Sequence, residues 1–472
     1  MTKIRLALLA AVASSVIGGG YAHAAGSNNA AITQNGDDNI AKIDQSGGAG
    51  NQFNSTGAAD TSSALQDGDD NTITATQSGN NNEIGLAGAG VDQIGDSNVF
   101  TATQSSNGNV VGSVQQDSSD YWWFGWYRGE NEATVTQQGG SNNTIDLISQ
   151  TATGNKNIAT LTQNGSDNYI NSVIQENTGS DDNSIDASIE GNNNGVAGFT
   201  SGSFAAASGA DDSSLKQYGS DNEIDLDING NFNQFGVYQD SNILGLAIGK
   251  NTLSALDING SYNELGVKQI GTNTLNLSSI NGDRNDIGVY QAGAGNNATI
   301  NLGATSNDNK VGLTQNLDND ADINIHSGDG NSIEAAQYGL NALDVDITGA
   351  GNEFVISQDG PLGVGTNDLT LTVYGSYNGA TGAFTSGGAA DIGLTAGSLV
   401  QNGTLNSASW SIGLSDPDSN NNLIAMAQVG SFNDITATID GDSNEVAISQ
   451  SGNFNTSVVT QSGTSNVVGI TQ

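Results

Sequence analysis

The chain has 472 residues, a formal net charge of −40, 65 Gly, two Pro and no Cys. This acidic balance argues against nucleic acid as a partner, because phosphate binding needs clusters of Lys and Arg. Without Cys there are no disulfides to stabilise the fold, and the scarcity of Pro is typical of a chain whose backbone N–H groups are needed in strand ladders.

Residues 1–24 differ in composition from the rest of the chain. Lys3 and Arg5 precede an apolar run from Leu6 to Ile17, and Ala22-His23-Ala24 fits a small-x-small cleavage site. This pattern predicts a secretory signal peptide. An uncleaved membrane anchor is the alternative, but the apolar run is short for a membrane span. We therefore expect a secreted chain of residues 25–472 with no membrane span after cleavage.

The remaining chain is built from a short repeat that is clearest at its C-terminal end. Gln450, Gln461 and Gln472 are 11 residues apart, and the links between them read Q-x-G-x-x-N. Residues between each Asn and the next Gln alternate in polarity, which predicts a strand. The link is typical of a turn in which Gly supplies a positive φ and Asn tolerates one. The candidate turn glycines are Gly36, Gly452 and Gly463.

Asn followed by Gln at the sixth position recurs along the chain, as in Asn109/Gln115, and other units have Ile in place of Gln. A repeat this short must bury its apolar face against its neighbours. We predict an all-β fold, a β-solenoid of about 20 stacked rungs in which each strand-turn-strand-turn unit has about 22 residues. Three segments break the repeat and are expected to be irregular insertions: 117–130, 196–214 and 359–410.

Asn and Gln share the parity of the apolar residues, so we expect their side chains to point inward. A buried amide costs free energy when it is unpaired. Identical amides stacked at the ~4.8 Å strand spacing can bond to the amides above and below them. We therefore predict amide ladders that also support self-assembly. The candidate ladder residues are Asn39, Gln45, Asn285, Gln291, Asn309, Gln315, Asn444, Gln450, Asn455, Gln461, Asn466 and Gln472.

The unit Q-x-G-x-x-N-x-(small or aliphatic)-x-x-x-Q resembles the curlin repeat of bacterial curli subunits, for example from Gln34 to Gln45 and from Gln450 to Gln461. The resemblance covers nearly all of residues 25–472. It implies a functional amyloid, a β-solenoid subunit that forms fibres on the surface of a Gram-negative bacterium for adhesion and biofilm matrix. The implied partners are further copies of the chain, other curli-type subunits and an outer-membrane export machinery.

Other functions fit the sequence less well. His326 is the one His of the expected mature chain, and no catalytic motif accompanies it, so neither an enzyme nor a cofactor is expected. Ca²⁺ could loosely screen the carboxylates of the acidic turns. The nonapeptide repeat of Ca²⁺-binding β-rolls does not recur, however, and no metal site is predicted. The alternative function is a finite solenoid adhesin whose insertions carry the binding.

The insertion at 117–130 is rich in aromatic residues. Trp122, Trp123 and Trp126 form a candidate contact loop, because exposed aromatic patches usually mark contacts. A loop folded back onto the solenoid is the alternative.

Overall fold

The computed structural model describes residues 28–54, 64–85, 90–118, 130–243, 246–247, 249–277, 280–303, 306–360, 366–379, 383–385, 387–413 and 419–472. The predicted signal peptide and the candidate contact loop of Trp122, Trp123 and Trp126 lie outside these residues. The chain divides into two compact units. Unit 1 comprises Met1–Ala197, Ser213–Leu226 and Gln239–Gly249, and unit 2 comprises Gly198–Asp212, Asp227–Tyr238 and Lys250–Gln472.

The described part of unit 1 is built of strands. They are β1 (Asn29–Ala30), β2 (Ile32–Asn35), β3 (Ile40–Asp44), β4 (Gln52–Phe53), β5 (Ala64–Asp67), β6 (Thr72–Gln77), β7 (Glu83–Ile84), β8 (Val91–Gly95), β9 (Val99–Gln104), β10 (Val110–Ser118), β11 (Asn131–Gly139), β12 (Thr144–Ala152), β13 (Asn157–Gly165), β14 (Tyr169–Asn177), β15 (Asn183–Glu190), β16 (Ser214–Tyr218), β19 (Asn242–Ile243) and β20 (Leu246–Ala247). The residues of β17 (Glu223–Asn229) and β18 (Gln234–Asp240) are divided between the two units.

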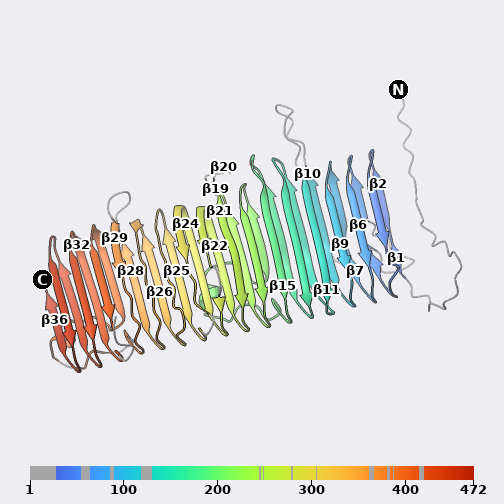
Figure 1. Ribbon diagram of the computed structural model, residues 1–472. Coiled ribbons are helices and arrows are strands. Elements are labelled where there is room, and N and C mark those ends of the chain that lie inside the picture. The colour runs from blue at the N-terminus through green and yellow to red at the C-terminus, as the bar shows by residue number, and fades with distance from the viewer. Residues whose placement is uncertain are drawn as a thin grey trace. The chain divides into compact units, whose positions relative to one another are not determined.

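Each long strand of unit 1 pairs in parallel with the strand one turn later, as the stacked strands of Figure 1 show. One face is formed by β2, β5, β8, β10, β12, β14 and β16. The other face is formed by β3, β6, β9, β11, β13 and β15. Two faces that are wound from one chain make a β-solenoid.

Unit 2 repeats this architecture. Its elements are α1 (Phe204–Ala207), β21 (Asn251–Asn259), β22 (Glu264–Asn276), β23 (Ile280–Asn281), β24 (Asp286–Thr299), β25 (Lys310–Asn316), β26 (Ser332–Tyr338), β27 (Leu340–Asn341), β28 (Glu353–Asp359), β29 (Thr366–Thr370), α2 (Gly387–Asp391), β30 (Ser398–Thr404), β31 (Ser407–Ile412), β32 (Leu423–Ser431), β33 (Asp434–Asp440), β34 (Glu445–Ser451), β35 (Thr456–Ser462) and β36 (Val467–Thr471). One face runs from β22 through β24, β25, β26, β28, β30, β32 and β34 to β36. On the other face β27, β29, β31, β33 and β35 pair in series.

The core of each unit lies between the two faces. In β24, Ile287, Val289 and Gln291 are fully buried, whereas Tyr290 between them is partly exposed. This alternation confirms the predicted all-β solenoid. The structure has about 15 turns instead of about 20. Turns are longer than expected because residues are inserted into many of them, so stacked Gln residues are separated by as few as 21 and as many as 43 positions.

The two later insertions differ in extent. Residues 196–214 leave the strands, form α1 and return at β16. The segment 359–410 is mostly solenoid, because β29, β30 and β31 lie within it and pair in register with their neighbours. Among its described residues, those between β29 and β30 lie outside the strands and include α2. The segment 359–410 is polar and rich in glycine, so its sequence did not predict strands β29, β30 and β31. Of the segment 117–130, only its first two residues and its last are described.

The expected turn glycines Gly36, Gly452 and Gly463 have φ values of 104°, 114° and 102°. The second left-handed residue of the turn is not Asn, as the sequence suggested, but the residue before it. Phe454 and Ser465 have φ values of 62° and 58°. The Asn of the repeat does not take the left-handed conformation, because its side chain is bonded to the Asn one turn earlier.

A second constraint acts on turn glycines that have a further turn stacked on them. An ideal Cβ on Gly430 would lie 1.9 Å from the carbonyl oxygen of Gly452. On Gly452, the nearest atom to such a Cβ is Asn455 Nδ2 at 3.7 Å. A turn glycine that has a further turn stacked on it therefore has no room for a side chain.

Gly430→Ala and Gly452→Ala form a matched pair for this constraint. Both put a Cβ on a left-handed residue, which costs about 1–2 kcal/mol. Gly430→Ala should lower the free energy of unfolding by a further ~1–3 kcal/mol, because the carbonyl of Gly452 must move. Urea unfolding of the two variants measures the difference. Equal losses would show that the stacked turn can yield without cost.

Candidate functional site

Inward-facing glutamines in unit 1 form two continuous ladders, buried except at the first turn. In each ladder the Nε2 of one Gln donates to the Oε1 of the Gln one turn later, at 2.7–3.1 Å. The first ladder contains Gln34, Gln66, Gln93, Gln116, Gln150, Gln175, Gln217 and Gln239. The second contains Gln45, Gln77, Gln104, Gln137 and Gln163. In the next turn of the second ladder, Ile189 stands opposite Gln163.

Unit 2 has one Gln ladder with the same direction. It contains Gln269, Gln291, Gln315, Gln337, Gln358, Gln401, Gln428, Gln450 and Gln472. On its other face the corresponding inward positions are aliphatic, as in the pair Ile412 and Ile439. Because every bond has the same donor direction, the ladder is polar: each turn offers an Nε2 donor to the turn that follows.

Asparagines at the strand starts form ladders of the opposite direction. The later Asn donates its Nδ2 to the Oδ1 of the earlier Asn, as Asn309 does to Asn285 at 3.1 Å and Asn466 does to Asn444 at 2.9 Å. Asn39 accepts from the backbone N of Asn71, and Asn455 donates to Asn433. These hydrogen bonds join the Asn side chains at successive strand starts, so each strand start is fixed to the strand start one turn earlier.

The predicted ladder residues thus fall into separate rows. Gln291 and Gln315 meet directly, as do Gln450 and Gln472. Asn285 and Asn309 share one row with Asn444 and Asn466, whereas Asn455 belongs to the row on the other face. Asn39 and Gln45 lie in rows of unit 1.

The six-residue spacing predicts the wrong ladder glutamine in one repeat. Gln115 is exposed, and its neighbour Gln116 occupies the ladder. Strand β10 holds an extra residue between Asn109 and Gln116, which shifts the parity. The same seven-residue spacing separates Asn143 from Gln150, and whole insertions separate Asn51 from Gln66. A search for Q-x-x-x-x-N links without a fixed strand length could have found Gln66 and Gln150, which precede Asn71 and Asn155 at that spacing.

Gln116→Ala and Gln115→Ala should differ strongly although the residues are adjacent. Gln116 accepts from Gln93 and donates to Val99 O and to Gln150, each at 2.8 Å. Its truncation leaves buried partners unpaired and a cavity, at a cost of about 2–4 kcal/mol. Gln115→Ala should be within about 0.5 kcal/mol of wild type. Chemical unfolding compares them, and similar losses would contradict the ladder assignment.

Gln461 departs from the predicted ladder. It stacks on Ile439, not on an amide. Its Nε2 is 3.5 Å from the backbone oxygen of Glu445, and its buried Oε1 has no hydrogen-bond partner among the described residues. An unpaired buried acceptor of this kind costs ~1–3 kcal/mol. The last turn therefore has glutamine on both faces, although the described turns before it in unit 2 have ladder glutamine on one face only.

The first and last described turns expose inward side chains that are covered elsewhere. Val446 and Ile448 are fully buried, whereas Val468 and Ile470, one turn later, are half-buried. Ile32 of β2 is half-buried in the same way. Among the described residues β35 and β36 each pair with one strand, as do β2 and β3. These turns present unpaired strand edges, which can template another chain.

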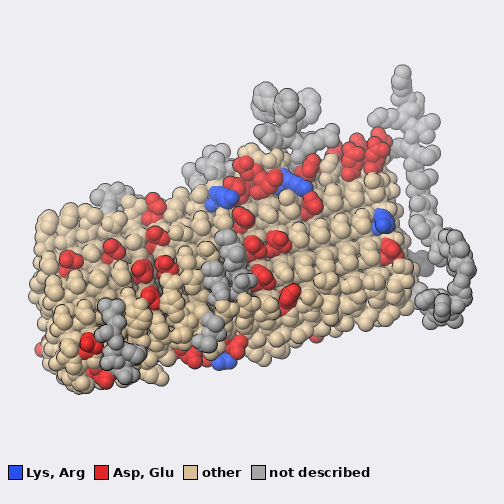
Figure 2. Space-filling view, viewed as in Figure 1, with Lys and Arg blue, Asp and Glu red and all other residues tan. Residues whose placement is uncertain are grey.

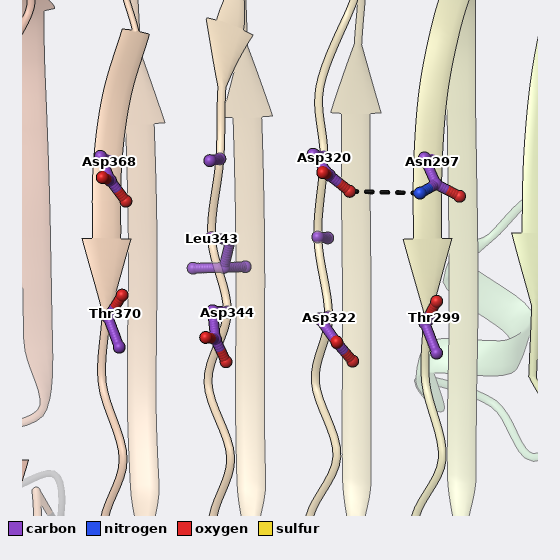
Figure 3. Close-up of a pocket in the computed structure, with 10 residues that line it drawn as sticks. Asn297, Thr299, Asp320, Asp322, Leu343, Asp344, Asp368 and Thr370 are labelled. Carbon is purple, nitrogen blue, oxygen red and sulfur yellow. Dashed lines mark hydrogen bonds between the residues drawn. The ribbon is translucent and has the colours of Figure 1, made fainter.

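Acidic side chains gather in patches on the outer surface, between wide uncharged areas (Figure 2). In unit 2, Asp320, Asp322, Asp344 and Asp368 line a hollow of about 430 Å³ (Figure 3). Asn297 Nδ2 donates to Asp320 at 3.3 Å. Burial, and then repulsion from Asp322, Asp346 and Asp368, raises the pKa of Asp344. In the described part of the chain no cluster of three or more His, Cys, Asp or Glu is arranged to hold a metal ion.

Asp344→Asn should stabilise the protein at pH 7. The folded-state pKa of Asp344 is raised, so its ionised form costs stability above the usual carboxyl range, and the cost disappears as the pH falls through that raised pKa. The gain in Tm should therefore vanish near pH ~3. Asp308→Asn is the opposite control, because the bond to Arg284 lowers the pKa of Asp308. A gain that persists in acid would contradict this account.

Comparison with known proteins identifies the repeat. The family model of the curlin associated repeat matches residues 68–105, which include β6 to β9, and residues 441–472, which include β34 to β36. No curated protein matches the chain. Among the described residues no helix is long and apolar enough to span a membrane. The two matched segments are similar to the curlin associated repeat and confirm the resemblance seen in the sequence.

Proposed function

We propose that the chain is a secreted structural subunit that polymerises head-to-tail into curli-like fibres on the surface of a Gram-negative bacterium, where the fibres serve adhesion and biofilm matrix. The last turn of one copy stacks on the first turn of the next. Other curli-type subunits and an outer-membrane export machinery are its further partners. The two matches to the curlin associated repeat and the unpaired strand edges support this proposal.

The observation that carries the proposal is Gln461. Its amide interrupts an aliphatic row and leaves a buried Oε1 without a partner. Within one chain this arrangement costs stability and gains nothing. In a fibre, Gln472 of one copy lies opposite Gln34 of the next, and Gln461 faces the glutamine row that Gln45 begins, so glutamine on both faces of the last turn matches glutamine on both faces of the first.

The direction of the ladders supports head-to-tail stacking. Each Gln donates Nε2 to the following turn, so Gln472 offers a donor, and Gln34 offers the Oε1 acceptor that its row has at every later turn. Two last turns placed against each other would bring donor against donor. The two ends also share a sequence pattern. In residues 466–472 and in residues 28–34, Asn, two apolar residues and Gln lie at alternate positions.

The test is assembly of the purified chain, followed by thioflavin T fluorescence and fibre diffraction. Fibres with a meridional reflection near ~4.7–4.8 Å are expected. A stable monomer that seeds do not recruit would overturn polymerisation and favour a finite adhesin.

Gln461→Met separates assembly from stability. Met has a similar shape and removes the unpaired Oε1, so the monomer should gain up to about 1–2 kcal/mol. Seeded elongation should nevertheless slow about tenfold, because a hydrogen bond from Gln461 to the glutamine row of the next copy is lost. Gln450→Met, which breaks the internal ladder, should destabilise the monomer. Wild-type elongation of Gln461→Met would show that the end glutamines do not pair.

A further inference from the structure

Two insertions of unit 2 share a sequence that the solenoid repeat does not explain. Clip 1, residues 198–212, contains Phe199-Thr200-Ser201-Gly202, and clip 2, residues 383–397, contains Phe384-Thr385-Ser386-Gly387. A short helix lies at the end of each sequence: α1 begins two residues after Gly202 in clip 1, and α2 begins at Gly387 itself in clip 2. Of clip 2, every residue except Ser386 is described.

Clip 1 binds outward side chains of the solenoid. Thr200 donates its backbone N to Glu264 Oε2 at 3.0 Å and its hydroxyl to Glu264 Oε1. One turn later, Asp286 accepts from the backbone N of Phe204 and of Ala205, at 2.8 and 2.9 Å. The clip is therefore held by carboxylates on two successive turns.

Clip 1 also needs a stripe of small residues beneath it. An ideal Cβ on Gly266 would lie 2.2 Å from Ala205 O, and one on Gly288 would lie 1.8 Å from Phe204 O. On Gly312 it would lie 2.4 Å from the Phe204 ring. These glycines are stacked in register on β22, β24 and β25, and none of them has a positive φ. Their lack of a side chain is required by the clip and not by the strand.

Clip 2 repeats the glutamate contact of clip 1 on the last turns, where Val467 takes the place of Asp286. Thr385 donates its backbone N to Glu445 Oε1 at 3.1 Å, and its hydroxyl bonds to the same oxygen. Phe384 and Ala389 pack in a buried cluster with Ala425 and Ala447. An ideal Cβ on Gly469 of β36 would lie 1.9 Å from Gly388 O.

The two sites correspond turn by turn. Glu264 and Glu445 each follow a ladder Asn directly, and Gly288 and Gly469 each lie three residues after one, on the next turn. In clip 1 the Phe204 ring reaches one turn further, to Gly312. The residue whose carbonyl takes the place of the Phe204 carbonyl in clip 2 is Gly388, so clip 2 has no ring at that place to extend past β36. Clip 2 therefore extends as far as β36, the last described strand.

We propose that the outward stripe of small residues and its Glu form a binding site for a Phe-Thr-Ser-Gly segment, used twice in this chain, and that clip 2 is a latch that holds β36 as the fibre-growing edge. The growth role rests on the proposed function. Holding β36 in place matters because a terminal strand with one neighbour frays easily. A frayed β36 cannot order an incoming chain.

Gly469→Ala and Thr385→Val in the full chain test the latch from both sides. Gly469→Ala forces α2 away from β36, and Thr385→Val removes the hydroxyl that binds Glu445 without changing the strand. Gly288→Ala and Thr200→Val do the same to clip 1, away from the growing edge. The readouts are hydrogen exchange of the β36 amides in the monomer and the rate of seeded elongation.

Both clip 2 variants should speed exchange of the β36 amides by about tenfold and slow elongation about fivefold. The clip 1 variants should speed exchange in α1 and β24 and leave elongation within about twofold of wild type. Unchanged β36 exchange, or faster exchange with wild-type elongation, would overturn the latch. An absence of wild-type fibres would overturn the proposed function itself, and exchange would still decide whether clip 2 holds β36.

Discussion

The amide ladder is the interaction on which the rest of the structure depends. A buried Gln or Asn is costly unless each of its polar atoms has a partner. In this narrow core the partner is the same residue one turn later, so every turn must stack in register with the next. That requirement fixes the parallel pairing of the strands. It also keeps the turns so close together that Gly430 has a carbonyl where a side chain would be.

A ladder is satisfied inside the stack and unsatisfied at its ends. The last turn of unit 2 exposes Asn466 and Gln472, and it buries Gln461 over Ile439 without a partner for Oε1. Donors run one way in the Gln rows and the other way in the Asn rows. The ends are therefore chemically different from each other, which gives the stack a direction in which it can be continued.

The outer surface of unit 2 is shaped by a separate constraint. Where the two clips lie, the outward residues are Gly or Ala, and a carboxylate accepts the backbone N–H of a threonine. Residues that look like weak points of a strand, such as Gly288 and Gly469, are contact sites for another segment of the same chain. Glycine in a strand often marks such a close approach of backbone.

The sequence by itself determined the all-β solenoid, the inward position of Asn and Gln, and the turn glycines, because all of these follow from a short period and an alternating pattern. It did not determine which residues meet. Gln116 replaces Gln115 because one extra residue in β10 reverses the parity, and strands β29, β30 and β31 were hidden within a segment that lacks the repeat. The clips could not be placed either. Phe-Thr-Ser-Gly occurs twice in the sequence, but its site is made of residues from successive turns, about 65 positions away in clip 1 and 60 in clip 2. Only the stacking of those turns brings the carboxylate and the small residues together on one surface.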